Sequence, residues 1–558
     1  MLTDFGKATL ADRYYWGKEK TSDDLFHRVA KAYGSNYDHS GRIMEYLQRL
    51  WFMPATPILS NGGTDRGLPI SCFLNTVGDS LKGIKDTWNE NTDLSSAGGG
   101  LGTYWGGVRS IGESVGSSGH TSGIIPFIKV QDSLSLAISQ GSLRRGSASV
   151  YLDVWHPEIE EFLELRKPTG DINRRSLNLH HGVNISDTFM WALKTGAPWF
   201  LFSPKTGEVV KTVNARRIWE RILELRLETG EPYINYIDTV NGALPESQRD
   251  LGLAVRQSNL CTEITLPTDD LRTAVCCLGS LNLAKWHEYS ADLDQVVRDC
   301  CEFLDNVLTD FANRTTVDRA KYSVLRERAI GLGVMGWHTF LQQEMIPFGS
   351  AMSKAWNKSI FKQLRKSADL ASKELADERG HCPDCPGERF SHKLAVAPTA
   401  NISIICGGVS AGIEPIPANI YTHKTLSGSF VIRNPELEKH LGSDQEVWDS
   451  ILKHDGSVQH LDIDPDLKEV FKTAFEIDQR WIVELAGDRA PSICQSQSVN
   501  LFLPANIHKQ DLHHLHWQAW LSGVKSLYYV RSKALKRATN VQDTVTPQYD
   551  TTECLACQ

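Results

Sequence analysis

From about residue 51 to residue 535, short apolar runs alternate with segments of helical periodicity, and turns rich in glycine or proline separate them. Strands that alternate with helices along a chain are typical of α/β proteins, in which helices cover a largely parallel sheet. No internal repeat or heptad pattern interrupts the alternation. We therefore predict an α/β domain over residues 51–535.

Two helices are clearly marked within this region. An apolar stripe over residues 218–225 ends before Gly230, a residue type that commonly closes helices. A second stripe over residues 293–308 includes Cys300, which this pattern assigns to the core.

The two ends of the chain differ from the central region. Residues 1–50 carry helical stripes, the first after a capping Ser22, and predict a small helical N-terminal region. Residues 536–558 are polar and lack apolar periodicity, so we predict a flexible C-terminal tail.

Charge and cysteine content limit the possible partners. The net charge is −8, from 59 Lys and Arg against 67 Asp and Glu, so we expect no nucleic-acid partner. The first residues lack a secretory signal and no stretch has transmembrane length, so we expect no membrane association and a cytoplasmic location. Twelve cysteines in a reducing compartment indicate packing, metal binding or redox catalysis.

The stretch SNLCTEITLPT places Asn259, Cys261 and Glu263 two residues apart. If the segment is extended, all three side chains project to one side and Leu260 and Thr262 to the other. An amide, a thiol and a carboxylate then converge on one ligand. The alternative is a strand with a buried cysteine and two solvated polar groups.

Three further stretches accompany it: PATPILSNGGT followed by LPISCFLNTVGDSL, RTAVCCLGSLNLAKW, and AVAPTANISIICGGVSAGIEP. Together they resemble, in order along the chain, the large catalytic subunit of ribonucleotide reductases. The resemblance implies a ten-stranded α/β barrel with a central finger loop that carries a radical cysteine. It also implies a homodimer that reduces ribonucleotides to 2'-deoxyribonucleotides for DNA synthesis.

The resemblance assigns roles to five residues. Cys261 corresponds to the thiyl radical that takes hydrogen from C3' of the ribose, Glu263 to the general base for the 3'-hydroxyl, and Asn259 to a residue that fixes the substrate hydroxyls. Cys72 and Cys276 correspond to the redox pair that reduces C2'; the alternative for each is a buried, packed thiol. Alternation along a strand sends the neighbouring Cys277 to the opposite face.

The segment of residues 397–403 has the pattern of a strand end that turns into a helix start, where backbone N–H groups can bind phosphate without net positive charge. An ordinary strand-to-helix turn is the alternative, because no Walker or dinucleotide motif is present. The resemblance favours substrate binding, and the residues it implies are Thr399, Ala400, Asn401 and Ile402, with Thr56, Ser71 and Gly100.

Tyr528 and Tyr529 stand side by side in GVKSLYYVRS. In a strand their rings point to opposite faces, one inward to Cys261 and one outward to a partner. The alternative is two aromatic residues of a half-buried strand. Such a pair resembles class I enzymes, in which a separate ferritin-like metal subunit supplies the radical, so we expect neither metal nor cofactor in this chain.

Cys554 and Cys557 form a C-x-x-C on the predicted tail. A dithiol on a flexible arm can reduce a buried disulfide and then be reduced by thioredoxin or glutaredoxin. Half of a zinc site is the alternative, and a second C-x-x-C, formed by Cys382 and Cys385, could supply the other half. We assign the redox role to the terminal pair and leave the second pair unassigned.

Effector control is a further implication of the resemblance. The family binds a deoxynucleotide or ATP as specificity effector at a dimer interface. The matching regions of this chain contain Asp79, Ser80, Leu81, Arg109 and, in the loop SQGSLRRG, Arg144. A start-of-catalytic-region pattern begins at residue 2, so we expect no ATP-cone and no overall switch by dATP.

These predictions describe a class I reductase of ribonucleoside diphosphates. A cobalamin-dependent (class II) reductase shares the cysteine and glutamate chemistry, and the tyrosine pair separates the two. A zinc-binding interaction protein that uses its C-x-x-C pairs is a remote alternative, which leaves the triad around Cys261 unexplained.

Overall fold

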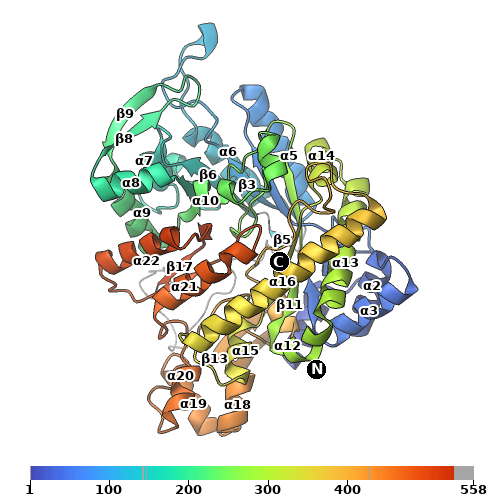
Figure 1. Ribbon diagram of the computed structural model, residues 1–558. Helices are drawn as coiled ribbons and strands as arrows, with labels where there is room; N and C mark the ends of the chain where they lie inside the picture. The colour runs from blue at the N-terminus through green and yellow to red at the C-terminus, as the bar shows by residue number, and fades with distance from the viewer. Residues whose placement is uncertain (1, 141–143, 146, 426–427, 533–558) are drawn as a thin grey trace.

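The structure is a computed structural model that describes residues 2–140, 144–145, 147–425 and 428–532 (Figure 1). Its main sheet has the strand order β1-β11-β2-β3-β6-β7-β10-β16, and β12 pairs with β11. The strands are β1 Phe52–Pro54, β2 Cys72–Thr76, β3 Gly100–Tyr104, β6 Ser147–Asp153, β7 His180–Ile185, β10 Tyr233–Tyr236, β11 Ala274–Asn282, β12 Ile330–Met335 and β16 Ser526–Leu527.

The sheet contains two parallel halves that run in opposite directions. Strands β2, β3, β6, β7 and β10 are parallel, whereas β11 is antiparallel to β2 and β16 is antiparallel to β10. Beyond β12, residues 393–397 pair in parallel with β12 through Leu394 and with Gln497 through Val396. The N–H of Tyr528 donates to the carbonyl of Val499 at 2.8 Å and closes the ring.

Counted over the described residues, this ring has ten members: the five strands of the first half, β11, β12, the two segments around Val396 and Gln497, and the segment that starts with β16. The predicted ten-stranded α/β barrel is confirmed. Helices cover its outside, and a large apolar core lies between them and the strands.

Helices connect successive strands, as the alternation predicts. Those that follow β2, β3, β6 and β7 are α5 Leu81–Ser96, α6 Ile125–Ala137, α7 Ile159–Leu163, α8 Asp187–Thr195 and α9 Ala215–Thr229. Those of the second half are α13 Leu293–Arg314, α14 Asp318–Glu327, α15 Trp337–Gln343, α16 Ala351–Arg379, α21 Gln479–Arg489 and α22 Lys509–Leu521. Figure 1 shows the long α16 crossing the molecule beside α21.

Both helices marked in the sequence are present. Gly230 closes α9 in the left-handed conformation, with φ of 84°, and Cys300 is fully buried in α13. The end of α9 at Gly230 and the burial of Cys300 in α13 both agree with the predictions from local sequence periodicity.

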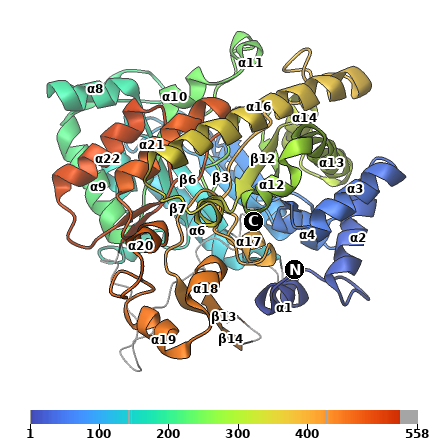
Figure 2. The same cartoon turned by 60° about the horizontal axis from the view of Figure 1, so that its bottom comes forward.

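The N-terminal region is helical, with α1 Asp4–Arg13, α2 Ser22–Tyr33 and α3 Tyr37–Gln48. The N-cap of α2 is Thr21 rather than Ser22, because the Thr21 hydroxyl and the Asp24 carboxylate form a capping box. Helix α3 contacts α13 of the barrel domain, where the Arg42 guanidinium donates twice to the Asp299 carboxylate, at 2.7 and 2.8 Å. Figure 2 shows α1 beside α17 Ile402–Ile405.

A small lobe lies outside the barrel. It comprises the hairpin of β13 Ile420–Thr425 and β14 Gly428–Arg433 and the helices α18 Pro435–Leu441, α19 Gln445–Lys453 and α20 Pro465–Val470, with an apolar cluster of its own (Figure 2). Among the described residues, no helix combines the length and apolar character needed to cross a bilayer.

The finger loop, residues 251–273, leads from α11 Glu246–Asp250 to β11 and passes through the barrel. It packs so closely on β3 that a Cβ atom on Gly102 would lie 2.1 Å from the Ser258 carbonyl oxygen. The Gln257 amide donates to the carbonyl of Asn75 at 2.8 Å, and the Tyr151 hydroxyl donates to the carbonyl of Asn259 at 2.9 Å. The first half of the barrel therefore fixes the loop up to its tip.

Candidate functional site

The tip of the finger loop is a tight turn and not the extended segment that the alternation of Asn259, Cys261 and Glu263 predicts. Thr262 has φ of 68°, in the left-handed region, and its N–H donates to the carbonyl of Asn259 at 3.3 Å. The second half of the barrel imposes this shape, because the Ser498 hydroxyl donates to the Cys261 carbonyl at 2.5 Å and the Ser526 hydroxyl to that of Thr262 at 2.8 Å.

The turn nevertheless brings the predicted polar groups together. The Asn259 side-chain amide donates to the Glu263 carboxylate at 2.9 Å and lies 3.8 Å from the Cys72 sulfur. Its carbonyl oxygen accepts from the N–H of Ile264 at 3.1 Å, which fixes the amide's orientation. Asn259, Cys261 and Glu263 are at most 1% exposed, which excludes the alternative of solvated polar groups.

Cys72 and Cys276 face each other across β2 and β11, where they are register partners of an antiparallel pair. Directly opposed residues of such a pair have Cβ atoms about 4.5 to 5.5 Å apart, close to the separation of a disulfide. Burial raises the pKa of the Cys276 thiol well above its ordinary value, although the Gln495 amide donates to its sulfur at 3.3 Å. Cys277 packs in the outer core instead, as strand alternation predicts.

The rings of Tyr528 and Tyr529 do not point to opposite faces as predicted. Their centroids are 4.3 Å apart, and residues 528–529 lie between β16 and β17 Val530–Ser532, outside both strands. The Tyr528 hydroxyl lies 3.5 Å from the Cys261 sulfur, and the Tyr529 hydroxyl lies 3.2 Å from Nδ1 of His180. A continuous series of groups therefore runs from the barrel centre to His180.

Sequence reasoning missed three residues of this series. The Tyr233 ring packs against both tyrosines, with centroid distances of 4.9 and 5.1 Å. His180, whose side chain is 17% exposed, hydrogen bonds to the buried Glu231 carboxylate at 2.5 Å. Burial alone would raise the pKa of Glu231, but His180 and Arg166 outweigh it and hold that pKa well below 4.5.

Comparisons with known proteins agree with this geometry. The family model "Ribonucleotide reductase, barrel domain" matches residues 70–389 and 384–530, and the model "Ribonucleotide reductase, all-alpha domain" matches residues 1–67. The chain belongs to the ribonucleotide reductase large-subunit family.

Individual relatives extend over almost the whole chain. A ribonucleoside-diphosphate reductase large subunit of Invertebrate iridescent virus 3 is 40% identical over 622 residues, 99% of this chain and 98% of that protein. A Frog virus 3 protein is 43% identical over 547 residues, which cover 96% of this chain and 95% of its own. The solved structure of the Actinobacillus ureae class Id ribonucleotide reductase alpha subunit superimposes with a TM-score of 0.85 at 32% identity, and covers 96% of this chain and 98% of its own. The class I assignment is therefore supported over the cobalamin-dependent alternative.

Two residues that the reductase resemblance assigns to the substrate, Ser71 and Gly100, lie next to Cys72, whereas Thr56 lies in a short helix outside the sheet. Ser71 precedes Cys72, with its hydroxyl 3.7 Å from that sulfur, and Gly100 is the register partner of Cys72 on β3. The Thr56 hydroxyl, in α4 Thr56–Asn61, hydrogen bonds to that of Tyr14 at 3.0 Å.

The predicted phosphate segment is a turn followed by a single helical turn, α17. Thr399 has φ of 53°, and its hydroxyl accepts from the N–H of Gly412 at 2.7 Å. Ala400 and Asn401 precede α17 and Ile402 opens it. Ala397 packs with Cys72 and Cys276, so this turn begins at the buried cysteine cluster.

Four of the five predicted effector residues, Asp79, Ser80, Leu81 and Arg109, lie together at the start of α5. The Arg109 guanidinium donates to the Asp79 carboxylate at 2.9 Å, Ser80 caps α5, and Leu81 is 62% exposed. Arg144 lies in β5 Arg144–Arg145, of which only the backbone is described.

The tail cysteines, Cys554 and Cys557, lie outside the described residues. The second C-x-x-C is described and buried: Cys382 and Cys385 close a turn that begins three residues after α16.

Proposed function

We propose that this chain reduces ribonucleoside diphosphates to 2'-deoxyribonucleoside diphosphates for DNA synthesis. One observation carries the proposal: the finger tip holds Asn259, Cys261 and Glu263 inside the barrel, beside the facing thiols of Cys72 and Cys276. An amide, an acid and three thiols in one buried site suit radical chemistry at a sugar ring, because water would quench the reactive intermediates.

In this proposal Cys261, as a thiyl radical, takes the hydrogen atom from C3' of the ribose and becomes a thiol. Glu263 accepts the 3'-hydroxyl proton, and Asn259 holds the substrate hydroxyls, since a general base must lie within hydrogen-bond reach of its proton. One thiol of the Cys72 and Cys276 pair protonates the departing 2'-hydroxyl, which leaves as water. The second thiol of the pair supplies the hydrogen of the new C2'–H bond, and the pair, having given up two electrons, becomes a disulfide. Glu263 returns its proton to the 3' oxygen, and Cys261 returns the hydrogen atom to C3' and is again a thiyl radical.

The raised pKa of Cys276 fits a proton donor. At neutral pH a buried thiol with a raised pKa keeps its proton until a better acceptor arrives. The Gln495 amide, which donates to this sulfur at 3.3 Å, is placed to stabilise negative charge that develops there.

The radical enters, we infer, through Tyr529 and Tyr528. The hydroxyl of Tyr528 is 3.5 Å from the sulfur that it oxidises, and the two rings touch. When the Tyr529 ring loses an electron, its phenolic proton passes to Nδ1 of His180 while the proton on that nitrogen passes to the Glu231 carboxylate, which lies 2.5 Å away. A separate ferritin-like metal subunit supplies the radical on the His180 side.

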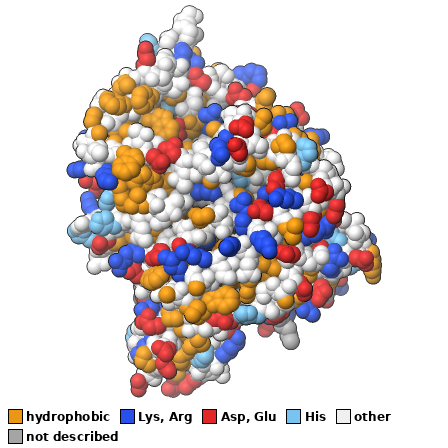
Figure 3. Space-filling view, in the orientation of Figure 1, with side chains coloured by type: hydrophobic (Ala, Val, Ile, Leu, Met, Phe, Trp, Pro, Cys, Tyr) orange, Lys and Arg blue, Asp and Glu red, His pale blue; other side chains and the backbone are white. Residues whose placement is uncertain are grey.

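The disulfide is reduced, in this proposal, by the tail dithiol of Cys554 and Cys557, which thioredoxin or glutaredoxin then reduces. The substrate's phosphates bind, in this proposal, to the segment of Thr399, Ala400, Asn401 and Ile402 together with Thr56. Backbone N–H groups of such a segment can bind phosphate without a net positive charge. Phosphate binding by backbone N–H groups is compatible with the mixture of positive and negative side chains on the face in Figure 3 and with the net charge of −8.

Specificity is set by a deoxynucleotide or ATP bound near Asp79, Ser80, Leu81, Arg109 and Arg144 at a homodimer interface. We place the enzyme in the cytoplasm.

The deciding experiment is a reduction assay of the full chain with a candidate metal subunit, each of the four diphosphates and each effector. Cys261→Ser should abolish product formation while diphosphate binding stays nearly intact. Cys300→Ala, a change in the core of α13, should leave the turnover rate unchanged. Product formation by the Cys261→Ser variant would refute the mechanism. Turnover with adenosylcobalamin and no second protein would refute the class I route.

A further inference from the structure

The second C-x-x-C, which the proposed reduction does not use, forms a tight turn. The N–H of Cys385 donates to the carbonyl of Cys382 at 3.1 Å, and the two residues form an antiparallel bridge. Pro383 occupies the second position, where its fixed φ favours such a turn. The first and fourth Cα atoms of a β-turn lie within about 7 Å, which overlaps the range of about 4.4 to 6.8 Å found in disulfides.

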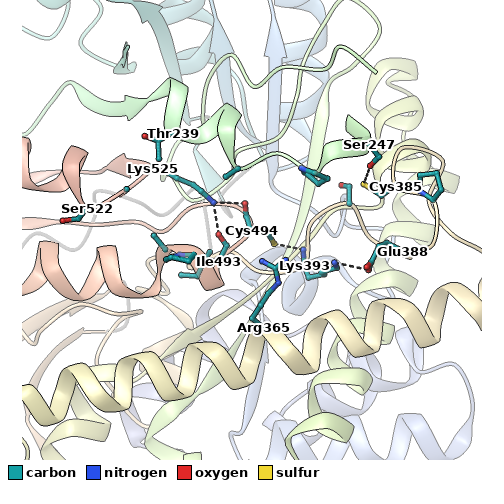
Figure 4. A pocket seen from close by; sticks show the side chains of 17 residues that line it. Thr239, Ser247, Arg365, Cys385, Glu388, Lys393, Ile493, Cys494, Ser522 and Lys525 are labelled. Atoms are coloured by element: carbon teal, nitrogen blue, oxygen red, sulfur yellow. Dashed lines mark hydrogen bonds and ion pairs between the residues drawn. The ribbon is translucent and has the colours of Figure 1, made fainter. Parts of the chain in front are cut away.

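The two thiols differ in access and in partners. Cys382 is fully buried, whereas Cys385 borders a cavity of about 500 Å³ (Figure 4). The Ser247 hydroxyl donates to the Cys385 sulfur at 3.2 Å, and the Lys393 side chain borders the same cavity. A hydrogen bond from the Cys382 thiol, helped by Ser247 and Lys393, lowers the pKa of Cys385 in spite of its burial. These are the surroundings of a reactive cysteine.

We propose that Cys385 is a peroxide-reactive thiol and that Cys382 is its resolving partner, so that the pair is a reversible oxidation site. The Cys385 thiolate attacks a hydroperoxide, an S–O bond forms, the O–O bond breaks, and the alcohol or water leaves. The Cys382 thiol then attacks the sulfenic acid, an S–S bond forms, and water leaves. A dithiol reductant returns two electrons and two protons and restores both thiols.

The turn is joined to the strand that carries Cys276. The Asp384 carboxylate, at the turn's tip, pairs with the guanidinium groups of Arg272 and Arg326, each at 2.6 Å. Arg272 lies two residues before β11 and is 4% exposed. Oxidation at the turn therefore takes place beside the base of the finger loop. The state of the two thiols can be measured directly, without an assay of nucleotide reduction.

The test uses the full reduced chain, hydrogen peroxide, alkylation and tryptic mass spectrometry. Cleavage after Arg379 and Arg389 releases GHCPDCPGER, which carries Cys382 and Cys385 and no other cysteine. We expect this peptide to lose two hydrogens and escape alkylation after peroxide, and to regain both alkylation sites after dithiothreitol. Cys494, which borders the same cavity without a partner in its tryptic peptide, is the internal control.

Variants separate the two roles. Cys382→Ser should leave a sulfenic acid at Cys385 that dimedone traps, and Cys385→Ser should abolish both trapping and the disulfide. Ser247→Ala should slow oxidation of Cys385 about three- to tenfold, because it removes a hydrogen bond to the thiolate. Ser522→Ala, on the same cavity, should leave the rate unchanged.

Two results would overturn the proposal. One is full alkylation of GHCPDCPGER at peroxide doses that already oxidise Cys494. The other is stoichiometric zinc in the purified chain whose removal by chelation exposes both thiols, because the pair would then be a metal site.

Discussion

Replacement of Gly102 by alanine tests whether the position of the finger tip sets the activity. The added methyl group would lie 2.1 Å from the Ser258 carbonyl oxygen, whereas ordinary contact begins at 3.4 Å, so the two backbones must separate by about 1.3 Å. Ser258 adjoins Asn259, and the separation therefore moves the amide that orients Glu263. Overpacking of this kind costs about 1 to 3 kcal/mol of unfolding free energy.

Activity should suffer more than stability. A misplacement of about 1 Å can reduce turnover about 100-fold, because reacting groups must stay within near-contact geometry. We expect Gly102→Ala to remain folded in urea titration, to bind diphosphate, and to lose about two orders of magnitude in single-turnover product formation. Gly41→Ala is the matched control, since its Cβ meets nothing within 4 Å on the exposed side of α3. Single-turnover rates within twofold of the native enzyme would refute the argument that the packing of the finger on β3 positions the chemistry.

Three other predictions follow from the site. Tyr528→Phe, which cannot lose a phenolic proton, should reduce turnover more than about 100-fold and leave radical formation in the partner subunit intact by electron paramagnetic resonance; normal turnover would remove Tyr528 from the route to Cys261. Cys554→Ser should give one normal single turnover but stop cycling with thioredoxin, and sustained cycling would contradict the tail's role. Glu231→Gln should lower the free energy of unfolding at pH 7 by about 3 to 5 kcal/mol, because it leaves the largely buried Arg166 guanidinium without its carboxylate partner. Since the folded pKa of Glu231 is lowered, this stabilisation is complete above about pH 4.5 and is lost as pH falls through the folded pKa. In urea titrations at descending pH, the free energies of unfolding of the variant and the native protein should therefore converge. Glu228→Gln, at an exposed position, is the control.

Local structure could be predicted from the sequence where a helix has one apolar face and a glycine end. The periodicity before Gly230 and that around Cys300 correspond to α9 and α13. The number of strands came from the resemblance, because several barrel members are short: β16 has two residues, and the segment around Val396 pairs through isolated bridges.

The site was harder to predict because distant residues impose its backbone shape. Alternation suggested that Asn259, Cys261 and Glu263 share a strand face, but hydrogen bonds from Ser498 and Ser526 fold the segment into a turn. These donors lie more than 230 residues away in sequence. No local pattern contains that information.

His180 and Tyr233 were missed for a related reason. Each is a single residue of a buried strand, and a lone histidine or tyrosine in a strand is most often a packing residue. Only the fold shows that His180 reaches Tyr529 across 349 positions of sequence, and that the Tyr233 ring packs against both. The tyrosine pair could be found from its sequence, but the orientation of its rings could not.

The finger tip also lies between two buried clusters to which the proposed mechanism assigns different redox chemistry. On one side lie the tyrosines that contact Cys261, in a cluster with Leu260 and Tyr233. On the other side lie Cys72 and Cys276, in a cluster with Ile264. A one-electron oxidant beside a two-electron thiol pair would oxidise it directly, so the loop that carries Cys261 must stand between them. In the proposed mechanism, the residues that make the turn, from Asn259 to Glu263, therefore keep the radical route and the thiol pair apart until a substrate joins them.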